Sequence, residues 1–230
     1  MPFKKRTAAA AAAVDAVQAT RVARRERRRD RSREEILDAA RRVLLRQGIA
    51  GMTLDAVAKE VGVSKTALYY YFASKDALLF ELVFGNLQTH AQAVHDAVET
   101  TATGAEALEA MVRTTHDVFA SRLDDFRLAY LHGQVAGQGA VHFNEAQFAR
   151  IRPLNDLWFA GAEKRLTGDR RKRVRAASIE PRLLAFLAWV ASIGLLTMKG
   201  MVESQDDPLI YTDAQLVDAL SQVFAAAAKA

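Results

Sequence analysis

Three adjacent tyrosines and two flanking lysines dominate the stretch GVSKTALYYYFASK at residues 62–75. Successive residues of a helix are rotated by about 100°, so three neighbouring rings cannot all face one core. Hydroxyl, ammonium and aromatic groups together suit duplex DNA, where they meet phosphate oxygens, base edges and thymine methyl groups. The alternative is that one or two of the tyrosines only cover the edge of a small core. Because lysines flank the rings, we favour contact with DNA.

The residues around the tyrosines predict two short helices joined by a tight turn. Thr53 can cap the first helix, and Gly62 ends it. Ser64 can cap the second helix, in which Leu68 and Phe72 point inward. This order is typical of the helix-turn-helix motif, whose second helix enters the major groove while the first crosses the backbone.

The outward side chains of this motif are the predicted DNA contacts. Lys65 can donate to guanine acceptors, and Thr66 can reach a base edge or a methyl group. Lys75 places a cation beside the phosphates, and the helix that begins at Thr53 directs its N–H groups outward, as phosphate sites require. The full predicted set is Thr53, Ser64, Lys65, Thr66, Tyr69, Tyr70, Tyr71 and Lys75.

Apolar residues recur at three- and four-residue spacing along most of the chain, which predicts an all-α protein. A capping box of Ser32 and Glu35 is expected to begin the first helix, which ends before Gly48. Pro153 should kink or split the helix in which it lies. The later helices are expected at about 53–61, 64–72, 74–99, 105–121, 125–135, 144–167, 181–201 and 213–228.

The positive charge is concentrated at the N-terminus. Residues 1–33 carry eleven Lys or Arg and three acidic residues, whereas the other 197 carry twenty-one basic and twenty-four acidic residues. Basic terminal segments often bind polyanions, nucleic acid above all. We expect residues 1–31 to form a disordered basic arm; an organellar transit peptide is the alternative for such a composition.

Other classes of protein find little support. The chain has no cysteine, which excludes disulfides and thiolate metal sites, and its histidines show no metal-ligand spacing, so no metal is predicted. No phosphate loop, nucleophile elbow or paired-carboxylate motif indicates an enzyme or a cofactor. The uncharged run 183–198 is shorter than the roughly 20 residues that span a membrane, so we expect a buried helix and no membrane partner.

The sequence TLDAVAKEVGVSKTALYYYFASKDALL resembles the N-terminal domain of the TetR family of bacterial transcriptional regulators, over about residues 32–84. The resemblance implies that Tyr69, Tyr71 and Lys75 contact phosphates, whereas Lys65, Thr66 and Tyr70 read bases. Asp55 departs from the pattern, because some family members place a basic DNA-contacting residue there.

The resemblance also implies the remaining organisation. Residues 32–78 would form the helix-turn-helix domain, and residues 79–230 a helical domain for ligand binding and dimerisation. Helix 181–201 is apolar around most of its circumference and helix 213–228 carries one apolar face, so we expect a homodimer through these two helices. The alternative is that both helices are buried within one chain. A two-fold dimer implies a palindromic operator in double-stranded DNA.

Polar residues on apolar helix faces are the candidates for contact with a small-molecule ligand, whose identity the sequence does not give. Pockets are mostly apolar with a few converging polar groups. The alternative for each residue is an ordinary hydrogen-bonded place in the core. The candidates are Asn86, His90, His116, Tyr130, Asn155 and Trp158.

These observations together predict a bacterial, cytoplasmic transcriptional regulator that is associated with the nucleoid when it binds DNA. By family analogy it is a repressor, which a small molecule releases from its operator. An architectural nucleic-acid-binding protein without an inducer is the alternative, in which the basic arm supplies most of the affinity.

Overall fold

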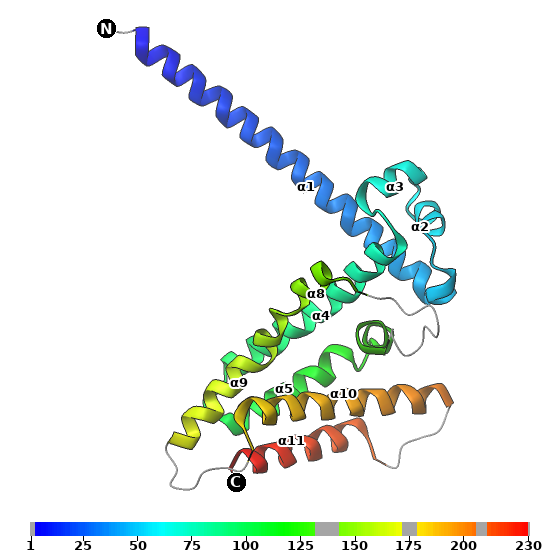
Figure 1. The fold of residues 1–230 in the computed structure, drawn as a ribbon, viewed down its shortest axis with the longest axis vertical. Helices are drawn as coiled ribbons and strands as arrows, with labels where there is room; N and C mark the ends of the chain where they lie inside the picture. Colours follow the sequence, from blue (N-terminus) through cyan, green and yellow to red (C-terminus); the bar gives the residue numbers. More distant parts are fainter. Residues whose placement is uncertain (1–2, 132–142, 172–178, 206–210, 230) are drawn as a thin grey trace. The chain divides into compact units, whose positions relative to one another are not determined.

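The computed structural model describes residues 3–131, 143–171, 179–205 and 211–229, and helices are the only regular elements in these ranges (Figure 1). The chain divides into two compact units, Met1–Leu79 and Phe80–Ala230. The first holds α1 (Phe3–Gly51), α2 (Leu54–Val61), α3 (Lys65–Tyr71) and the start of α4 (Lys75–Glu99). The second holds the rest of α4 and α5 (Gly104–Phe119), α6 (Leu123–Phe126), the π-helical turn η1 (Arg127–Leu131), α8 (Glu145–Ile151), α9 (Leu154–Arg171), α10 (Pro181–Gln205) and α11 (Asp213–Lys229).

The all-α prediction is confirmed, and so is the break at Pro153, which lies between α8 and α9. Helix 125–135 was predicted as one segment, but the described part consists of α6 and η1, and residues 132–135 lie outside the described ranges. The π-helical turn follows a very short α-helix, a distinction that apolar spacing alone does not reveal.

The predicted start of the first helix is wrong. The Ser32 hydroxyl donates to the Arg28 carbonyl, a bond inside a helix, and does not cap an N-terminus. The backbone of α1 is helical from Phe3, where a disordered arm was expected over residues 1–31. Alanine and arginine, which dominate this segment, are strong helix formers, and no glycine or proline interrupts them between Phe3 and Gly48.

The first unit has a small core in which α2 packs against both α1 and α3. Apolar side chains at helical spacing on α1 form the base of this core and are almost fully buried: Ile36, Ala39, Ala40 and Val43. Val57 of α2 and Leu68 of α3 are fully buried as well. This core fixes the orientation of α3 against α1 and α2.

The second unit is built around α5, which packs against α9, α10 and α11. Its apolar face is buried, with Leu108, Val112 and Phe119 fully inaccessible. At its N-terminus α5 approaches α9 so closely that a Cβ on Gly104 would lie 2.5 Å from Leu166 Cδ2 and 2.9 Å from the Leu166 Cα. A glycine is therefore required at this contact.

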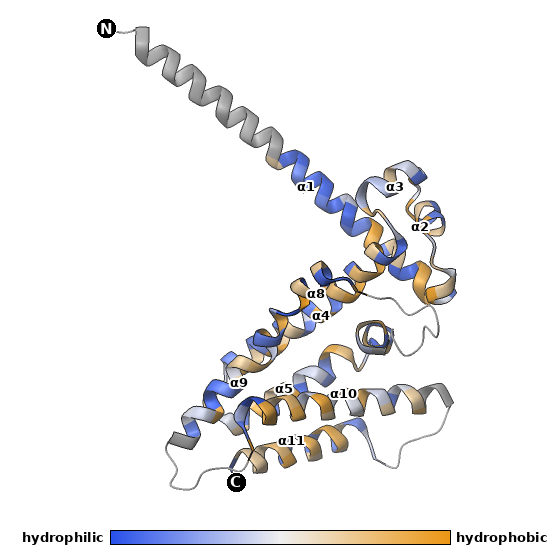
Figure 2. Ribbon diagram, in the orientation of Figure 1, coloured by the Kyte–Doolittle hydropathy of each residue, from blue (hydrophilic) through white to orange (hydrophobic). Residues whose placement is uncertain are grey.

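Helix α10 is long and apolar enough, by length and composition, to cross a membrane over Pro181–Val202, and a third of its most apolar window is buried. It also packs against α5 and α9, with Ala185, Ala188 and Ser192 inside the unit. Hydrophobic residues run along both α10 and α11 in Figure 2.

Candidate nucleic-acid interface and ligand site

Three local contacts shape the turn between α2 and α3. The Thr53 hydroxyl accepts the Ala56 amide at 3.1 Å and caps α2, and the Ser64 hydroxyl accepts the Ala67 amide at 3.1 Å and caps α3. Between them Gly62 ends α2 in the left-handed conformation, with a φ of 79° that favours glycine. The predicted caps and turn are confirmed.

Helix α3 has one anchored side and one exposed side. Leu68 is fully buried and Phe72, at the end of the helix, is nearly so. Tyr69 is 46% exposed and Tyr70 is 69% exposed, whereas Tyr71 is half-buried with its ring edge-to-face against Tyr70 at 5.2 Å. Two of the three rings therefore face solvent, and the third is half-buried beside Tyr70.

Lys65 forms an ion pair with Asp55 across the helix-turn-helix motif. Its ammonium lies 2.9 Å from the Asp55 carboxylate and 5.9 Å from the centre of the Tyr69 ring. Hydrogen bonding to Asp55 raises the pKa of Lys65. Both side chains are more than half exposed, so the pair is weak and a phosphate or a base can replace the carboxylate. The departure seen at Asp55 in the sequence thus bears directly on Lys65.

Lys75 is more constrained than the sequence indicated. Its ammonium donates to the Ile49 carbonyl near the end of α1, and the side chain is half-buried. The Ser74 hydroxyl accepts the Ala77 amide at 3.0 Å and caps α4. The cation is therefore held in place beside the N-terminus of α4.

An open groove of about 410 Å³ lies where the N-termini of α2 and α4 meet α3. Helix N-termini carry unpaired N–H groups and a partial positive charge, which favour phosphate. The groove is lined by Thr53, Leu54 and Asp55 at the start of α2, Tyr69 of α3, and Ala73, Ser74 and Lys75 at the start of α4. The structure thus brings three predicted contacts (Thr53, Tyr69 and Lys75) and two flanking polar residues to one groove. It leaves Thr66 and Tyr70 exposed on α3.

In the second unit, His90 of α4 is the centre of a buried hydrogen-bond chain. Its Nδ1 lies 2.7 Å from the Tyr130 hydroxyl and its Nε2 lies 3.0 Å from Thr115 Oγ1. Burial lowers the pKa of His90 to about 3 and raises the pKa of the Tyr130 hydroxyl, so both groups are neutral near pH 7. One nitrogen of a neutral imidazole donates while the other accepts.

Aromatic rings surround this chain. Phe119 and Trp158 lie 5.1 and 5.8 Å from the His90 ring, and Trp189 lies 5.7 Å from Tyr130, measured between ring centres. The indole nitrogen of Trp158 is buried without a hydrogen-bond partner in the described part of the chain. A buried donor that lacks an acceptor carries a free-energy cost, which a ligand oxygen would remove.

Among the six predicted ligand contacts, the structure brings His90, Tyr130 and Trp158 together. Asn86 is buried one turn from His90, but its amide donates to the Asp125 carbonyl at 3.4 Å.

The other two candidates lie elsewhere. His116 faces α11, with Nε2 3.5 Å from the Asp213 carboxylate and Nδ1 3.2 Å from Asp117. Asn155 is exposed in the first turn of α9.

Sequence reasoning missed Thr115 and Trp189. Thr115 lies four residues after Met111 on the buried face of α5, a spacing that would have revealed it. No comparable signal marks Trp189, because α10 is apolar on nearly every side. Within the described residues, no group of three or more His, Asp or Glu side chains could hold a metal ion.

The sequence of the first unit is the part of the chain that most clearly matches known proteins. Residues 36–82 match the family model described as bacterial regulatory proteins, tetR family. The HTH-type transcriptional regulator LmrA of Bacillus subtilis is 36% identical over 83 residues, which is 36% of this chain and 44% of LmrA. The HTH-type transcriptional activator FasR of Mycolicibacterium smegmatis is 29% identical over 102 residues, 44% of this chain and 47% of FasR. The matches thus span less than half of these relatives.

Solved structures extend the likeness to the fold of most of the chain. The regulator FadR from Bacillus subtilis, in complex with stearoyl-CoA, superposes with a TM-score of 0.64 over 84% of this chain and 98% of FadR, at 16% identity. A TetR/AcrR-family regulator from Thermobifida fusca gives a TM-score of 0.60 at 18% identity over 84% of this chain and 96% of that one. At these identities the shared property is the all-helical fold.

Proposed function

We propose that this chain, whose residues 36–82 match the model of tetR-family bacterial regulatory proteins, is a transcriptional regulator that binds operator DNA and responds to a small molecule. The observation that carries the proposal is the two-sided α3: Leu68 and Phe72 anchor it, and Tyr69 and Tyr70 face solvent. Two curated relatives that match the chain, LmrA and FasR, are a transcriptional regulator and a transcriptional activator.

In the proposed complex α3 lies in the major groove. Lys65, Thr66 and Tyr70 are exposed along its outer side and meet base edges. The groove between α2 and α4 receives a backbone phosphate, which the helix N-termini and Lys75 stabilise. As the complex forms, the Lys65 ammonium leaves the Asp55 carboxylate and contacts DNA instead.

Dimerisation is proposed to cover an apolar face that the single chain leaves exposed. Five residues of α10 at helical spacing are 39–52% exposed: Leu183, Leu187, Val190, Met198 and Met201. Val223 of α11 is 62% exposed. Contiguous exposed apolar faces of this kind mark interaction sites. A two-fold axis through α10 and α11 would present two copies of α3 to an inverted repeat.

The ligand is proposed to bind around His90, Tyr130 and Trp158. The likeness of fold to FadR, which was solved in complex with stearoyl-CoA, is consistent with a protein that binds a small molecule. A ligand that binds better to a DNA-incompetent conformation releases the operator by shifting the population. Helix α4 carries Lys75 at its first residue and His90 further along, so it links the two sites through one continuous element.

The experiment for DNA binding compares two exposed tyrosines. Tyr70→Ala should weaken binding to a selected operator by about 1–3 kcal/mol in fluorescence anisotropy, because a base contact is lost. Tyr211→Ala, at a tyrosine that is 59% exposed outside the first unit, serves as the matched control and should bind as the unmodified chain does. Equal affinity of the two variants would refute the proposed role of α3.

The alternative, an architectural DNA-binding protein without an inducer, differs in its thermodynamic linkage. If a ligand found by screening lowers the affinity for DNA by some factor, a saturating concentration of operator must lower the affinity for that ligand by the same factor. Ligand affinity that does not change with operator would remove the regulatory proposal and leave the architectural one.

A further inference from the structure

Seven arginines occur within the ten residues RRERRRDRSR, at 24–33 of α1, before the part of the helix that enters the core. Residues 24–31 are all exposed, and this part of α1 is hydrophilic in Figure 2. The segment contains no apolar residue. It therefore has no face that could insert into a membrane or pack into a coiled coil.

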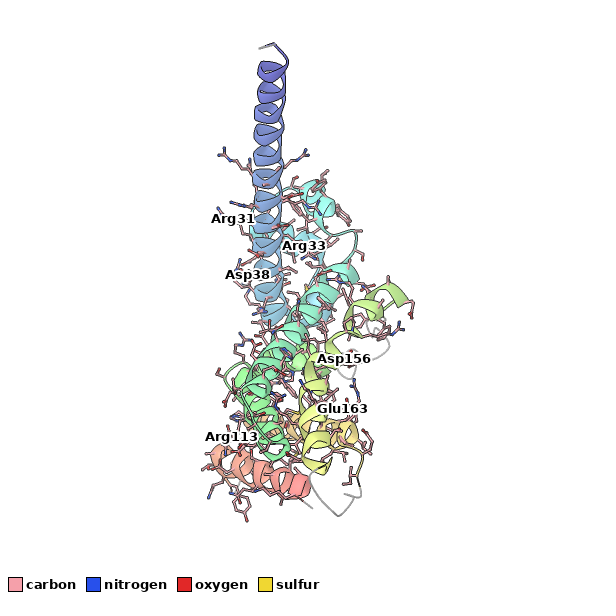
Figure 3. The ribbon with its side chains drawn as sticks, turned by 90° about the vertical axis from the view of Figure 1, so that its left-hand side faces the viewer. Arg31, Arg33, Asp38, Arg113, Asp156 and Glu163 are labelled. Atoms are coloured by element: carbon pink, nitrogen blue, oxygen red, sulfur yellow. The ribbon has the colours of Figure 1, made fainter. Side chains whose placement is uncertain are left out.

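The arginines fall on two faces of the helix. Arg24, Arg27, Arg28 and Arg31 follow i, i+3, i+4, i+7 spacing, which places them within an arc of about 100°. We call these four residues the arginine stripe. Arg33 belongs to the other face: Figure 3 shows that it leaves α1 on a different side from Arg31.

A residue on the second face, Arg33, contacts the end of α3. The Arg33 guanidinium lies 5.2 Å from the centre of the Phe72 ring, and Phe72 is the residue that ends α3. The arginine stripe therefore ends two residues before Arg33, which contacts the residue at the end of α3 directly. Both belong to the same compact unit.

We propose that the arginine stripe is a second DNA-binding surface, which contacts backbone phosphates next to the bases that α3 reads. The proposal rests on the proposed function of α3. Like charges at i, i+4 destabilise an isolated helix. The four guanidinium groups of the arginine stripe therefore repel one another, and a bound polyanion would reduce this repulsion. The stripe spans about 10 Å of helix axis, over which one strand of duplex presents about three phosphates. The family-model match begins at residue 36, after the stripe.

The test measures the salt dependence of binding to a mixed-sequence duplex by fluorescence anisotropy. One variant replaces the four stripe residues by glutamine (R24Q, R27Q, R28Q, R31Q), and the matched control replaces the same four by lysine, which keeps the charge. Three phosphate contacts contribute about 2.7 to the slope of log K against log salt, so the glutamine variant should lose about that much per protomer. The lysine control should keep the slope of the unmodified chain.

Two results would overturn the proposal: a glutamine variant with an unchanged slope, or a lysine control that loses as much slope as the glutamine variant. If the glutamine variant instead loses only binding to phosphatidylserine vesicles, the surface serves a membrane and the proposal is wrong. Failure of the unmodified chain to bind duplex at low salt would contradict the proposed function itself. The two failures are thus distinguishable. Thermal unfolding of both variants should match that of the unmodified chain, because the stripe lies outside the core.

Discussion

Acidification should destabilise this protein through one buried side chain, His90. The imidazole is fully buried, hydrogen-bonded at both nitrogens to Tyr130 and Thr115, and burial lowers its pKa to about 3. In the unfolded chain the pKa of a histidine is about 6.5. As the pH falls below 6.5, His90 is protonated in the unfolded state but stays neutral in the folded state. The contribution of His90 is therefore complete above pH 6.5 and is lost progressively between pH 6.5 and 3.

The size of the effect follows from the two pKa values. One pH unit corresponds to about 1.4 kcal/mol, so lowering the pH from 7.5 to 5 should remove about 2 kcal/mol of unfolding free energy through His90 alone. A typical domain has only about 5–15 kcal/mol in total. The loss should therefore be readily visible as a lower urea midpoint.

The assay is urea unfolding, followed by circular dichroism, at pH 7.5 and pH 5. His90→Gln keeps one donor and one acceptor but cannot titrate, so its stability should fall by about 2 kcal/mol less than that of the unmodified chain over this interval. His95→Gln, at a half-buried histidine on the same helix, controls for the effect of replacing any histidine by glutamine. An equal pH dependence with and without His90 would refute the reasoning.

A neutral His90 also means that the ligand group beside it should be uncharged.

The remaining predictions concern the first unit, the apolar face and one close helix contact. Asp55→Asn should strengthen binding to mixed-sequence DNA in anisotropy assays, because it frees Lys65 and removes a carboxylate near the phosphates; weaker binding would contradict the exchange described for Lys65. Val190→Glu should convert a dimer to a monomer in sedimentation velocity, since it places a charge in the apolar face of α10, and an unchanged mass would refute that interface. Gly104→Ala should cost about 1–3 kcal/mol in urea unfolding because its Cβ meets Leu166, whereas Gly85→Ala, with no atom within 4 Å of its Cβ, should be neutral or stabilising; similar effects at both sites would contradict the close packing of α5 on α9.

The helix-turn-helix motif could be predicted from the sequence because its determinants are local. Thr53 and Ser64 cap helices through bonds to amides three residues away, and Gly62 supplies a backbone conformation that few other residues adopt. Apolar spacing then assigned Leu68 and Phe72 to the buried side of α3. The ion pair of Lys65 was not predicted, because it joins residues on two different helices.

The ligand candidates were harder to predict because the buried face of a long helix depends on its neighbours. His116 lies one residue after the buried Thr115, but it meets the acidic end of α11 instead of the aromatic cluster. Asn155 lies two residues after the predicted break at Pro153, and its side chain is exposed in the first turn of the new helix. Similarly, Ser32 looked like a helix cap only because the preceding arm was expected to be disordered.

The most direct test of the central claim is selection of bound duplexes from a random-sequence library by the purified full chain. If two copies of α3 read DNA through their exposed tyrosines, the selected sequences should contain an inverted repeat with half-sites about one helical turn apart or a multiple of it. Tyr70→Ala should lose preference at a symmetric position in each half-site. A selected pool without any repeated sequence, or no retention of duplex at low salt, would contradict the account.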